Sequence, residues 1–428
     1  MKKRGFRISK RRMFAYGLAV FAFLILAHLT PKSKTDINQY WNTAQRAFNQ
    51  EIDPYPLYPG DRLPFIYPPS GILMFLPYAH LTMDEAAKGM FVLNCVLVIV
   101  VLMGLIIRDL SRSGAHGRLA TWGPLFVALY GGVHVTIALS QVNIIMLGFL
   151  WMYWRRLREG APSATAGVGL VLGSAAKPHY GLLLALAAPR FGRNLVLGVV
   201  AASICLFAAT LLLLPNGVWD SWLVHIAGHT SYTELPEGHR SIAVPWNRSL
   251  PGLVARFMVP NPYSNPAWTS APLASAISSA AVLGLFAATG LAVIRSMRCP
   301  GRDALRRDLE LAAVTLALFL ASPASWTHHL VMLLPAALLA LRDFALNREA
   351  AWWSRFGVGI VLAVMGLTLD EFLSVAARAS SLLVMSLVTF SVAALWSITV
   401  GRLFALASER RDRRIGPRVP SPAGTAPR

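Results

Sequence analysis

The chain contains about twelve long apolar runs, and this feature constrains its fold more than any other. A helix that crosses a bilayer needs roughly 20 predominantly apolar residues, and the runs lack the alternating pattern of a transmembrane β-barrel. Of the 428 residues, 55% are hydrophobic and 14% are charged, which excludes a soluble nucleotide-binding enzyme. We therefore expect an all-α polytopic membrane protein with about twelve transmembrane helices. The runs lie near residues 13–30, 87–107, 119–139, 143–154, 162–176, 179–190, 194–215, 270–294, 309–322, 328–342, 356–370 and 380–402.

The distribution of basic residues predicts how these helices cross the membrane. The formal net charge is +20, from 40 Lys and Arg against 20 Asp and Glu. With the basic N-terminus inside, 30 of the 40 basic residues fall in the inner loops and termini, as the positive-inside rule requires. This charge favours contact with anionic membrane lipids and not with nucleic acid. The expected location is the plasma (inner) membrane, with multiple crossings and both termini cytoplasmic.

The loops predict where function resides. The membrane domain is expected to span residues 1–402, with an uncleaved anchor helix at its start and a basic, disordered cytoplasmic tail over 403–428. Two long outer loops, about 31–86 and 216–269, are rich in Trp, Tyr, Pro, Asn and His. Residues 67–81 contain three prolines and are expected to form a partly buried juxtamembrane helix at the outer face. Chemistry is therefore expected at the extracytoplasmic face.

Asp36 is the candidate catalytic residue of the first outer loop. It follows the first apolar run by only about seven residues, so it is expected near the lipid phosphate plane. A carboxylate there can take the proton from a sugar hydroxyl that attacks an anomeric carbon. Considered alone, however, Asp36 is explained better as a solvated loop residue or a helix cap than as a catalytic base.

Other polar residues at the outer ends of the runs suggest binding roles. Lys177 interrupts an apolar stretch where the charge bias predicts no cation; it either extends to the head groups or neutralises a lipid phosphate. Arg240 and Arg248 are candidate phosphate clamps, because a guanidinium binds phosphate oxygens in pairs. Amide and aromatic side chains that suit sugar or acceptor binding are Tyr67, Gln141, Asn143 and Asn247. Amides at a helix end, such as Gln141 and Asn143, are more often satisfied locally. The glycosylation sequon at 247–249 is interpreted as coincidence.

The segment around His328 and His329 gives the strongest local signal. Two adjacent histidines, Trp326 and a proline lie between two apolar runs, and ionisable groups at membrane depth are costly and usually functional. The histidines lack the i,i+4 spacing of a helical metal pair, and the three cysteines show no pair spacing, so no metal site or disulfide is expected. We expect at least one of the histidines to donate to a phosphate or sugar.

Two further patterns limit the source of a transferred sugar. Gly167, Gly169 and Gly173 superficially match a dinucleotide fingerprint, but their spacing and apolar setting favour close helix packing. The sequence has neither a Walker A motif nor a D-x-D motif. A sugar transferase without a nucleotide site would take its sugar from an activated lipid phosphate.

In order along the chain, these motifs resemble those of glycosyltransferase family 87, the polyprenol-phosphate-mannose-dependent mannosyltransferases of the GT-C superfamily. The resemblance covers roughly residues 13–342; one departure is the basic Arg248, where a small or amide side chain is expected. The motifs are Asp36, Tyr67-Pro68-Pro69, Gln141-x-Asn143, Lys177-Pro178, Asn247-x-Ser249-Leu250 with Gly252, and Ser322-Pro323-x-Ser325-Trp326-x-His328-His329.

This resemblance implies a GT-C membrane fold with an outer-facing active site. It implies a metal-independent, inverting transfer without a cofactor, from a polyprenyl-phosphate sugar to a glycolipid or glycan acceptor. Asp36 would be the general base, and Lys177, His328, His329, Arg240 and Arg248 would bind the departing phosphate. Two alternatives remain, a multi-span secondary transporter and a lipid-linked glycan ligase or polymerase, although transporters usually place their ionisable groups near the bilayer midplane.

Overall fold

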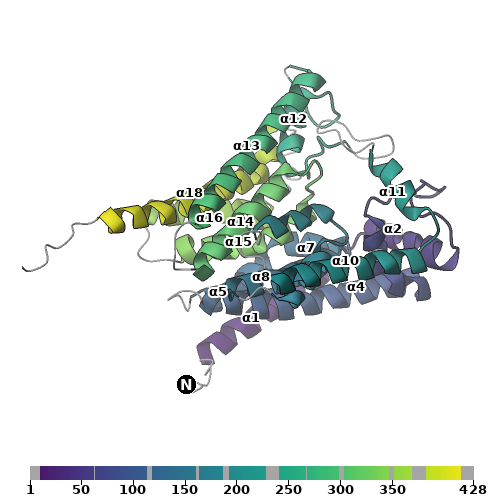
Figure 1. Cartoon of the computed structure of the whole chain (residues 1–428), viewed down its shortest axis with the longest axis horizontal. Helices are drawn as coiled ribbons and strands as arrows, with labels where there is room; N and C mark the ends of the chain where they lie inside the picture. The colour runs from purple at the N-terminus through teal and green to yellow at the C-terminus, as the bar shows by residue number, and fades with distance from the viewer. Residues whose placement is uncertain are drawn as a thin grey trace, which may run out of the picture.

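The computed structural model describes most of the chain as a bundle of helices (Figure 1). The described residues contain no strand, and their bridges are two isolated pairs. They comprise 10–61, 63–112, 118–160, 163–186, 192–227, 241–266, 268–297, 303–346, 351–368 and 382–415.

Within the described residues, the predicted apolar runs coincide mainly with helices, and the all-α prediction is confirmed. By length and composition, five helices within the described residues could cross a membrane. They are α1 (Lys10–Leu29), the continuous helix Met83–Ser111 that contains α4 (Met83–Leu97), η3 (Val98–Ile106) and most of α5 (Ile107–Arg112), α10 (Arg193–Leu213), α13 (Ala271–Met297) and α18, for which the span is Leu382–Leu406.

The remaining runs form shorter or interrupted helices. These are α6 (Leu119–Leu129), α7 (Gly131–Ala138), α8 (Asn143–Arg158), α9 (Ala164–Ser174), η4 (Pro178–Leu186), α14 (Asp303–Ala321), η6 (Thr327–Leu333), α15 (Leu334–Ala340), η7 (Leu341–Ala345) and α16 (Trp352–Leu367). Connecting segments contribute α2 (Thr35–Ala44), η1 (Gln45–Asn49), α3 (Pro69–Ile72), η2 (Leu73–His80), α11 (Val218–Ala227) and α12 (Leu250–Met258). The helix expected over 67–81 is thus present as α3 and η2, with Pro77 inside η2.

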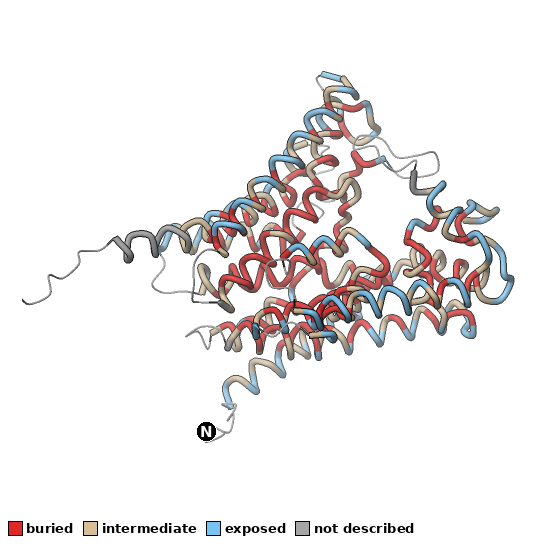
Figure 2. Tube along the Cα trace, in the orientation of Figure 1, coloured by how far each residue is buried: buried red, intermediate tan, exposed pale blue. Residues whose placement is uncertain are grey.

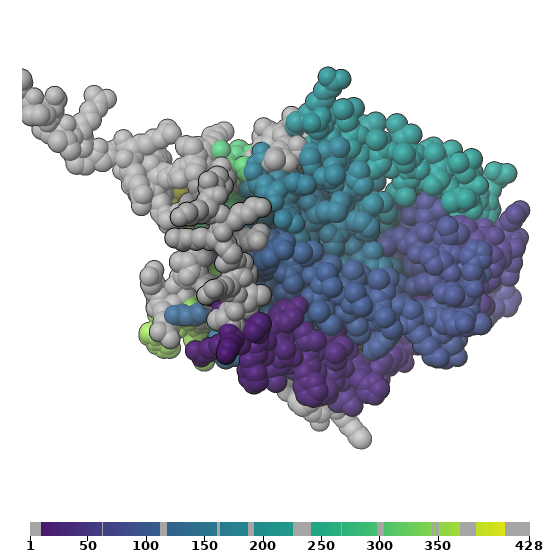
Figure 3. All heavy atoms as spheres, turned by 90° about the horizontal axis from the view of Figure 1, so that it is seen from below, coloured from purple at the N-terminus to yellow at the C-terminus, as the bar shows by residue number. Residues whose placement is uncertain are grey.

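The helices form two groups that diverge in Figure 1. One group includes α1, α4, α8 and α10, and the other includes α13, α14, α16 and α18. The described start of α1 and the far end of α18 lie on the same side of the picture, opposite α2 and α11. Seen from below, most of the described atoms on this face belong to the N-terminal half of the chain (Figure 3).

Glycines set the closest helix contacts of the first group. A Cβ on Gly198 of α10 would lie 2.2 Å from the Ala164 oxygen of α9, and one on Gly169 would lie 2.8 Å from the Phe149 oxygen of α8. Backbones this close leave no room for a side chain. The glycine pattern of residues 167–173 therefore serves helix packing, as expected from its apolar setting.

Burial separates a protein core from a lipid-facing surface. Buried residues follow α14 and α15 through the centre of the molecule, whereas α10 and α13 present mixed, largely exposed faces (Figure 2). Leu212 of α10, for example, is 83% exposed. Apolar side chains exposed along a helix of membrane-spanning length are suited to contact with lipid tails.

The break between α6 and α7 positions part of the functional site. Tyr130 adopts an extended backbone between the two helices, and its hydroxyl donates to the Leu330 oxygen at 3.0 Å. A Cβ on Gly132 would lie 2.8 Å from Leu330 Cβ. Because glycine occupies that position, α7 can pack directly on η6, the element that carries both adjacent histidines.

A buried group of charges joins the helices far from α2. Asp308 of α14 is fully buried; its Oδ1 lies 2.5 Å from Arg158 Nε and accepts from Trp154 Nε1 at 3.1 Å. Arg158 also donates to the Asp109 backbone oxygen at 3.0 Å. We call Asp308, Arg158, Trp154 and Asp109 the Asp308 cluster. It connects α5, α8 and α14.

The C-terminal segment differs from the sequence expectation over part of its length. Helix α18 (Leu382–Ile415) continues past residue 402, so residues 403–415 are helical where a disordered tail was expected. The high proportion of Arg and Pro suggested disorder, but the Pro residues begin only after the helix ends. Residues 416–428 lie outside the described part of the chain.

Candidate active site

Asp36 lies in the first turn of α2, where the macrodipole favours a carboxylate. It is neither a loop residue nor the N-cap, which is Lys34. Its side chain is half-buried, and its Oδ2 accepts a hydrogen bond from Gln141 Nε2 at 2.5 Å. Asp36 thus contacts a residue more than one hundred positions away, which the simpler loop or cap interpretation does not anticipate.

Two tyrosines complete the contacts of the Gln141 side chain. The hydroxyls of Tyr40 and Tyr67 donate to Gln141 Oε1 at 2.8 and 3.2 Å, and the hydroxyl oxygens lie 3.1 Å apart. Burial, followed by the neighbouring Tyr67 and Asp36, raises the pKa of Tyr40 well above its usual value. The Tyr40 hydroxyl therefore stays protonated at neutral pH and remains a donor. We call Asp36, Gln141, Tyr40 and Tyr67 the Asp36 network.

Stacked aromatic rings support this network from the first connecting segment. Phe75 of η2 stacks on Tyr40 with ring centroids 4.4 Å apart. Tyr55 donates its hydroxyl to the Tyr67 backbone oxygen at 2.8 Å, and Phe65 meets the Tyr67 ring edge-on at 5.4 Å. Aromatic pairs add stability beyond the area they bury. The two tyrosine hydroxyls are consequently held by rings that have little freedom to move.

Lys177 forms the cationic side of the site. It lies in the turn between α9 and η4, and its Nζ donates to Asn143 Oδ1 at 2.7 Å. The same Nζ lies 5.9 Å from the centre of the Tyr67 ring. Burial lowers the pKa of Lys177 well below its usual value, while the negative charge of Asp36 acts in the opposite direction. The carboxylate of Asp36 and the amine of Lys177 are therefore close enough to interact electrostatically.

His328 and His329 lie beside Lys177 at the start of η6. Asn143 Nδ2 and Thr136 Oγ1 donate to the His328 backbone oxygen at 3.1 and 2.9 Å. The two imidazole rings meet edge-on with centroids 4.3 Å apart, and the charge of Lys177 acts on both. The structure therefore brings together Asp36, Tyr67, Gln141, Asn143, Lys177 and the two histidines.

Asn247 holds the loop before α12 against the loop before η6. It is fully buried, and its Nδ2 donates at 2.8 Å to the backbone oxygens of Ile242 and Pro323. Its Oδ1 accepts from Ser325 N at 3.1 Å, and its backbone pairs with Trp326 in an isolated bridge. The side chain amide is used for packing, so the sequon does not present an accessible acceptor.

Arg248 has a similar structural setting. It is 1% exposed, and its Nη1 donates to the backbone oxygens of Pro245 at 2.6 Å and Met385 at 3.4 Å. Arg248 therefore joins the loop before α12 to α18, and its backbone N–H donates to the Ser325 oxygen at 2.7 Å. Arg240, the other candidate phosphate clamp, lies outside the described residues.

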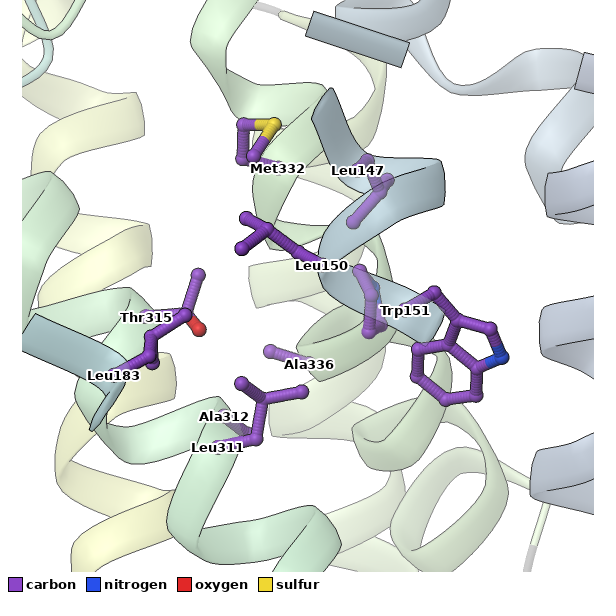
Figure 4. Close-up of a pocket in the computed structure, with 10 residues that line it drawn as sticks. Leu147, Leu150, Trp151, Leu183, Leu311, Ala312, Thr315, Met332 and Ala336 are labelled. Carbon is purple, nitrogen blue, oxygen red and sulfur yellow. The ribbon is translucent and has the colours of Figure 1, made fainter. Parts of the chain in front are cut away.

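A small apolar cavity lies between the helices that carry Asn143 and His328 and their neighbours (Figure 4). It is lined by side chains of α8, η4, α14, η6 and α15, among which Thr315 supplies the one hydroxyl and none is charged. Leu147 in its wall follows Asn143 by four residues on α8, about 6 Å along an α-helix, and Met332 follows His328 by four residues on η6. Within its lining, Thr315 is the one side chain that can form a hydrogen bond with a sugar, apart from the indole N–H of Trp151.

Sequence reasoning missed several members of the site. Tyr40 follows Asp36 by four residues on α2, and i,i+4 side chains share a helix face, so a helical interpretation of 35–44 would have found it. Thr136 and Asn94, which donates to the Gln141 backbone oxygen at 3.2 Å, carry no comparable local signal. They contribute through packing between distant helices.

The fold and site define an all-helical membrane protein in which a half-buried carboxylate, Asp36, lies near a buried amine, Lys177. A family model for glycosyltransferase family 87 matches residues 65–323, more than half of the chain. The chain belongs to this family and is a glycosyltransferase. Family membership thus favours an enzyme over the secondary transporter that the sequence left as an alternative.

A curated relative adds detail about that protein's own substrate. The polyprenol-phosphate-mannose-dependent alpha-(1-2)-phosphatidylinositol mannoside mannosyltransferase of Mycobacterium tuberculosis is 27% identical over 346 residues. The similarity covers 75% of this chain and 73% of that protein. The resemblance noted from the motifs is therefore confirmed at the level of the family.

Proposed function

We propose that the protein transfers a hexosyl group, mannosyl in the simplest case, from a polyprenyl-phosphate sugar to a hydroxyl of a lipid-linked or cell-envelope glycan. The relative's dependence on polyprenol-phosphate-mannose supports this donor. The observation that carries the proposal is the Asp36 network beside Lys177. We place it on the extracytoplasmic face of a GT-C-type fold with about twelve crossings and cytoplasmic termini.

The proposed reaction is a single inverting displacement. As the acceptor oxygen forms a bond to the anomeric carbon, Asp36 takes the acceptor's proton. The bond from that carbon to the phosphate oxygen breaks, and polyprenyl phosphate leaves as an anion. The leaving group therefore needs no general acid, only donors that stabilise its growing charge.

Residues around the donor are assigned by their chemistry. Lys177, His328 and His329 would bind the phosphate, since the structure gathers them at one place. Tyr67 and Asn143 would line the sugar side. Asn247 and Trp326 are proposed for the acceptor side, and Arg240 and Arg248 as further phosphate ligands. The side chains of Asn247 and Arg248 also donate to backbone oxygens.

The direct test is incubation of membranes that contain the protein with radiolabelled polyprenyl-phosphate mannose. We expect label to enter a glycolipid or envelope glycan that can be separated by chromatography, and membranes from a strain without the gene serve as control. Absence of protein-dependent labelling from any of several polyprenyl-phosphate sugars would overturn the proposal.

Substitutions at the phosphate-binding residues should chiefly weaken use of the donor. We expect Lys177→Met to raise the donor KM and lower kcat/KM by about 10- to 100-fold, because a charge-assisted bond to the phosphate is lost. His329→Ala should act in the same direction but less strongly. Initial rates at varied donor and acceptor concentrations would separate the effects.

Lys88→Met is the matched control, since it removes a lysine near the start of α4 that has no place in the site. An effect of Lys177→Met confined to the acceptor KM would contradict the phosphate assignment.

A further inference from the structure

Gln141 lies in the turn that follows α7, and the backbone conformation of this turn fixes the direction of its side chain. Helix α7 ends at Ala138, and Ser140, the residue after the C-cap Leu139, has a positive φ of 53°. Ser140 N donates to the Ile137 oxygen at 3.1 Å and Gln141 N donates to the Thr136 oxygen at 2.9 Å. This bonding pattern is the Schellman motif, in which glycine normally takes the left-handed position. A residue with a side chain in that conformation is strained, and such strain often accompanies functional sites.

The orientation of the Gln141 amide follows from its partners. An ionised carboxylate only accepts hydrogen bonds, so the amide edge facing Asp36 must be the nitrogen. The oxygen edge then faces Tyr40 and Tyr67, whose hydroxyls both donate to it. A carbonyl oxygen has two lone pairs. Two tyrosine donors occupy both, and the amide is locked with its nitrogen toward Asp36.

This saturation changes the role expected from the sequence. The Gln141 side chain is 3% exposed, and its oxygen has no lone pair left for a sugar hydroxyl. The Gln141 side chain can instead influence the reaction through the hydrogen bond that its nitrogen donates to Asp36 Oδ2.

We propose that Gln141 is a positioning residue that holds the Asp36 carboxylate in one orientation for proton abstraction, and that Tyr40 and Tyr67 act through it. The inference rests on the proposed function of Asp36 as general base. A fixed carboxylate matters because small misplacements of a reacting group reduce rates severely, by up to about 10²-fold for 1 Å.

The test compares kcat and KM for Gln141→Leu, Gln141→Glu and Tyr67→Phe in the full-length protein. We expect Gln141→Leu to lower kcat about 10- to 100-fold, with both KM values unchanged within about twofold. Gln141→Glu should be at least as damaging, because two adjacent carboxylates tend to share one proton. Tyr67→Phe should lower kcat less, since one of two bonds to the amide oxygen remains.

Tyr153→Phe is the matched control. It also removes a buried tyrosine hydroxyl that donates to a backbone oxygen, that of Leu183 at 2.6 Å, but Tyr153 lies on α8 outside the Asp36 network. Its kcat should stay at the wild-type value. The melting temperature of each purified variant identifies loss of fold, and Tyr67→Phe keeps the proposal testable if Gln141→Leu does not fold.

The outcomes separate this inference from the proposed function. A raised acceptor KM with unchanged kcat for Gln141→Leu would restore a sugar-binding role and overturn positioning. Full activity of Gln141→Leu together with an inactive Asp36→Asn would overturn only the inference. Full activity of Asp36→Asn would overturn the base assignment itself.

Discussion

We expect Asp36→Asn to lower the rate of sugar transfer by about 10²- to 10⁴-fold, the usual contribution of a general base. Asparagine has the shape of aspartate and can still accept the bond from Gln141, so the network should keep its packing. The amide cannot take a proton from the acceptor. The loss should therefore appear in kcat, measured by transfer of label from polyprenyl-phosphate mannose.

Asp84→Asn is the control for this experiment. Asp84 lies in the first turn of α4 and pairs with Lys34 on the exposed surface, with side chains 66% and 64% exposed. Its replacement should leave transfer within about twofold of the wild type, because exposed ion pairs contribute little. Transfer by Asp36→Asn at the rate of Asp84→Asn would remove Asp36 from the mechanism.

The largest expected effect on stability is that of Asp308→Ala. This substitution leaves the buried guanidinium of Arg158 without the carboxylate that lies 2.5 Å from it. Removing one partner of a buried ion pair typically costs about 3–5 kcal/mol. We expect a lower melting temperature in detergent and a lower yield of folded protein.

Glu159→Ala serves as the comparison on the neighbouring helix end. Glu159 pairs with Arg155 and Arg156, but its side chain is 43% exposed. The expected cost is below about 1 kcal/mol. Equal stability losses in the two variants would mean that burial of the Asp308 cluster does not set its importance.

Prediction from the sequence succeeded for the helices and only partly for the site. Apolar runs such as 194–215 become helices such as α10 because a long apolar segment has few other ways to satisfy its backbone in lipid. The run 119–139, however, is divided at Tyr130. Its adjacent glycines gave no clear break, since glycine is common in membrane helices as well.

The candidate residues show the same limit. Asp36, Lys177 and the adjacent histidines were predicted as candidates because charged or ionisable groups are conspicuous at the ends of apolar runs, and the structure places them near one another. Arg248 was found by the same reasoning, yet the structure buries it against backbone oxygens. Residue type alone identified both Lys177 and Arg248 as candidates, but it does not predict which groups each side chain contacts in the folded protein.

The sequence by itself determined that the chain is helical and membrane-embedded, because hydrophobic length and charge distribution act locally along the chain. Only the tertiary structure decided that residues 36, 67 and 141 meet in the Asp36 network and that residue 177 lies beside it. Those contacts depend on the register between helices, set by close backbone approaches such as Gly132 against η6. That register is a property of packed surfaces, and no short stretch of sequence encodes it.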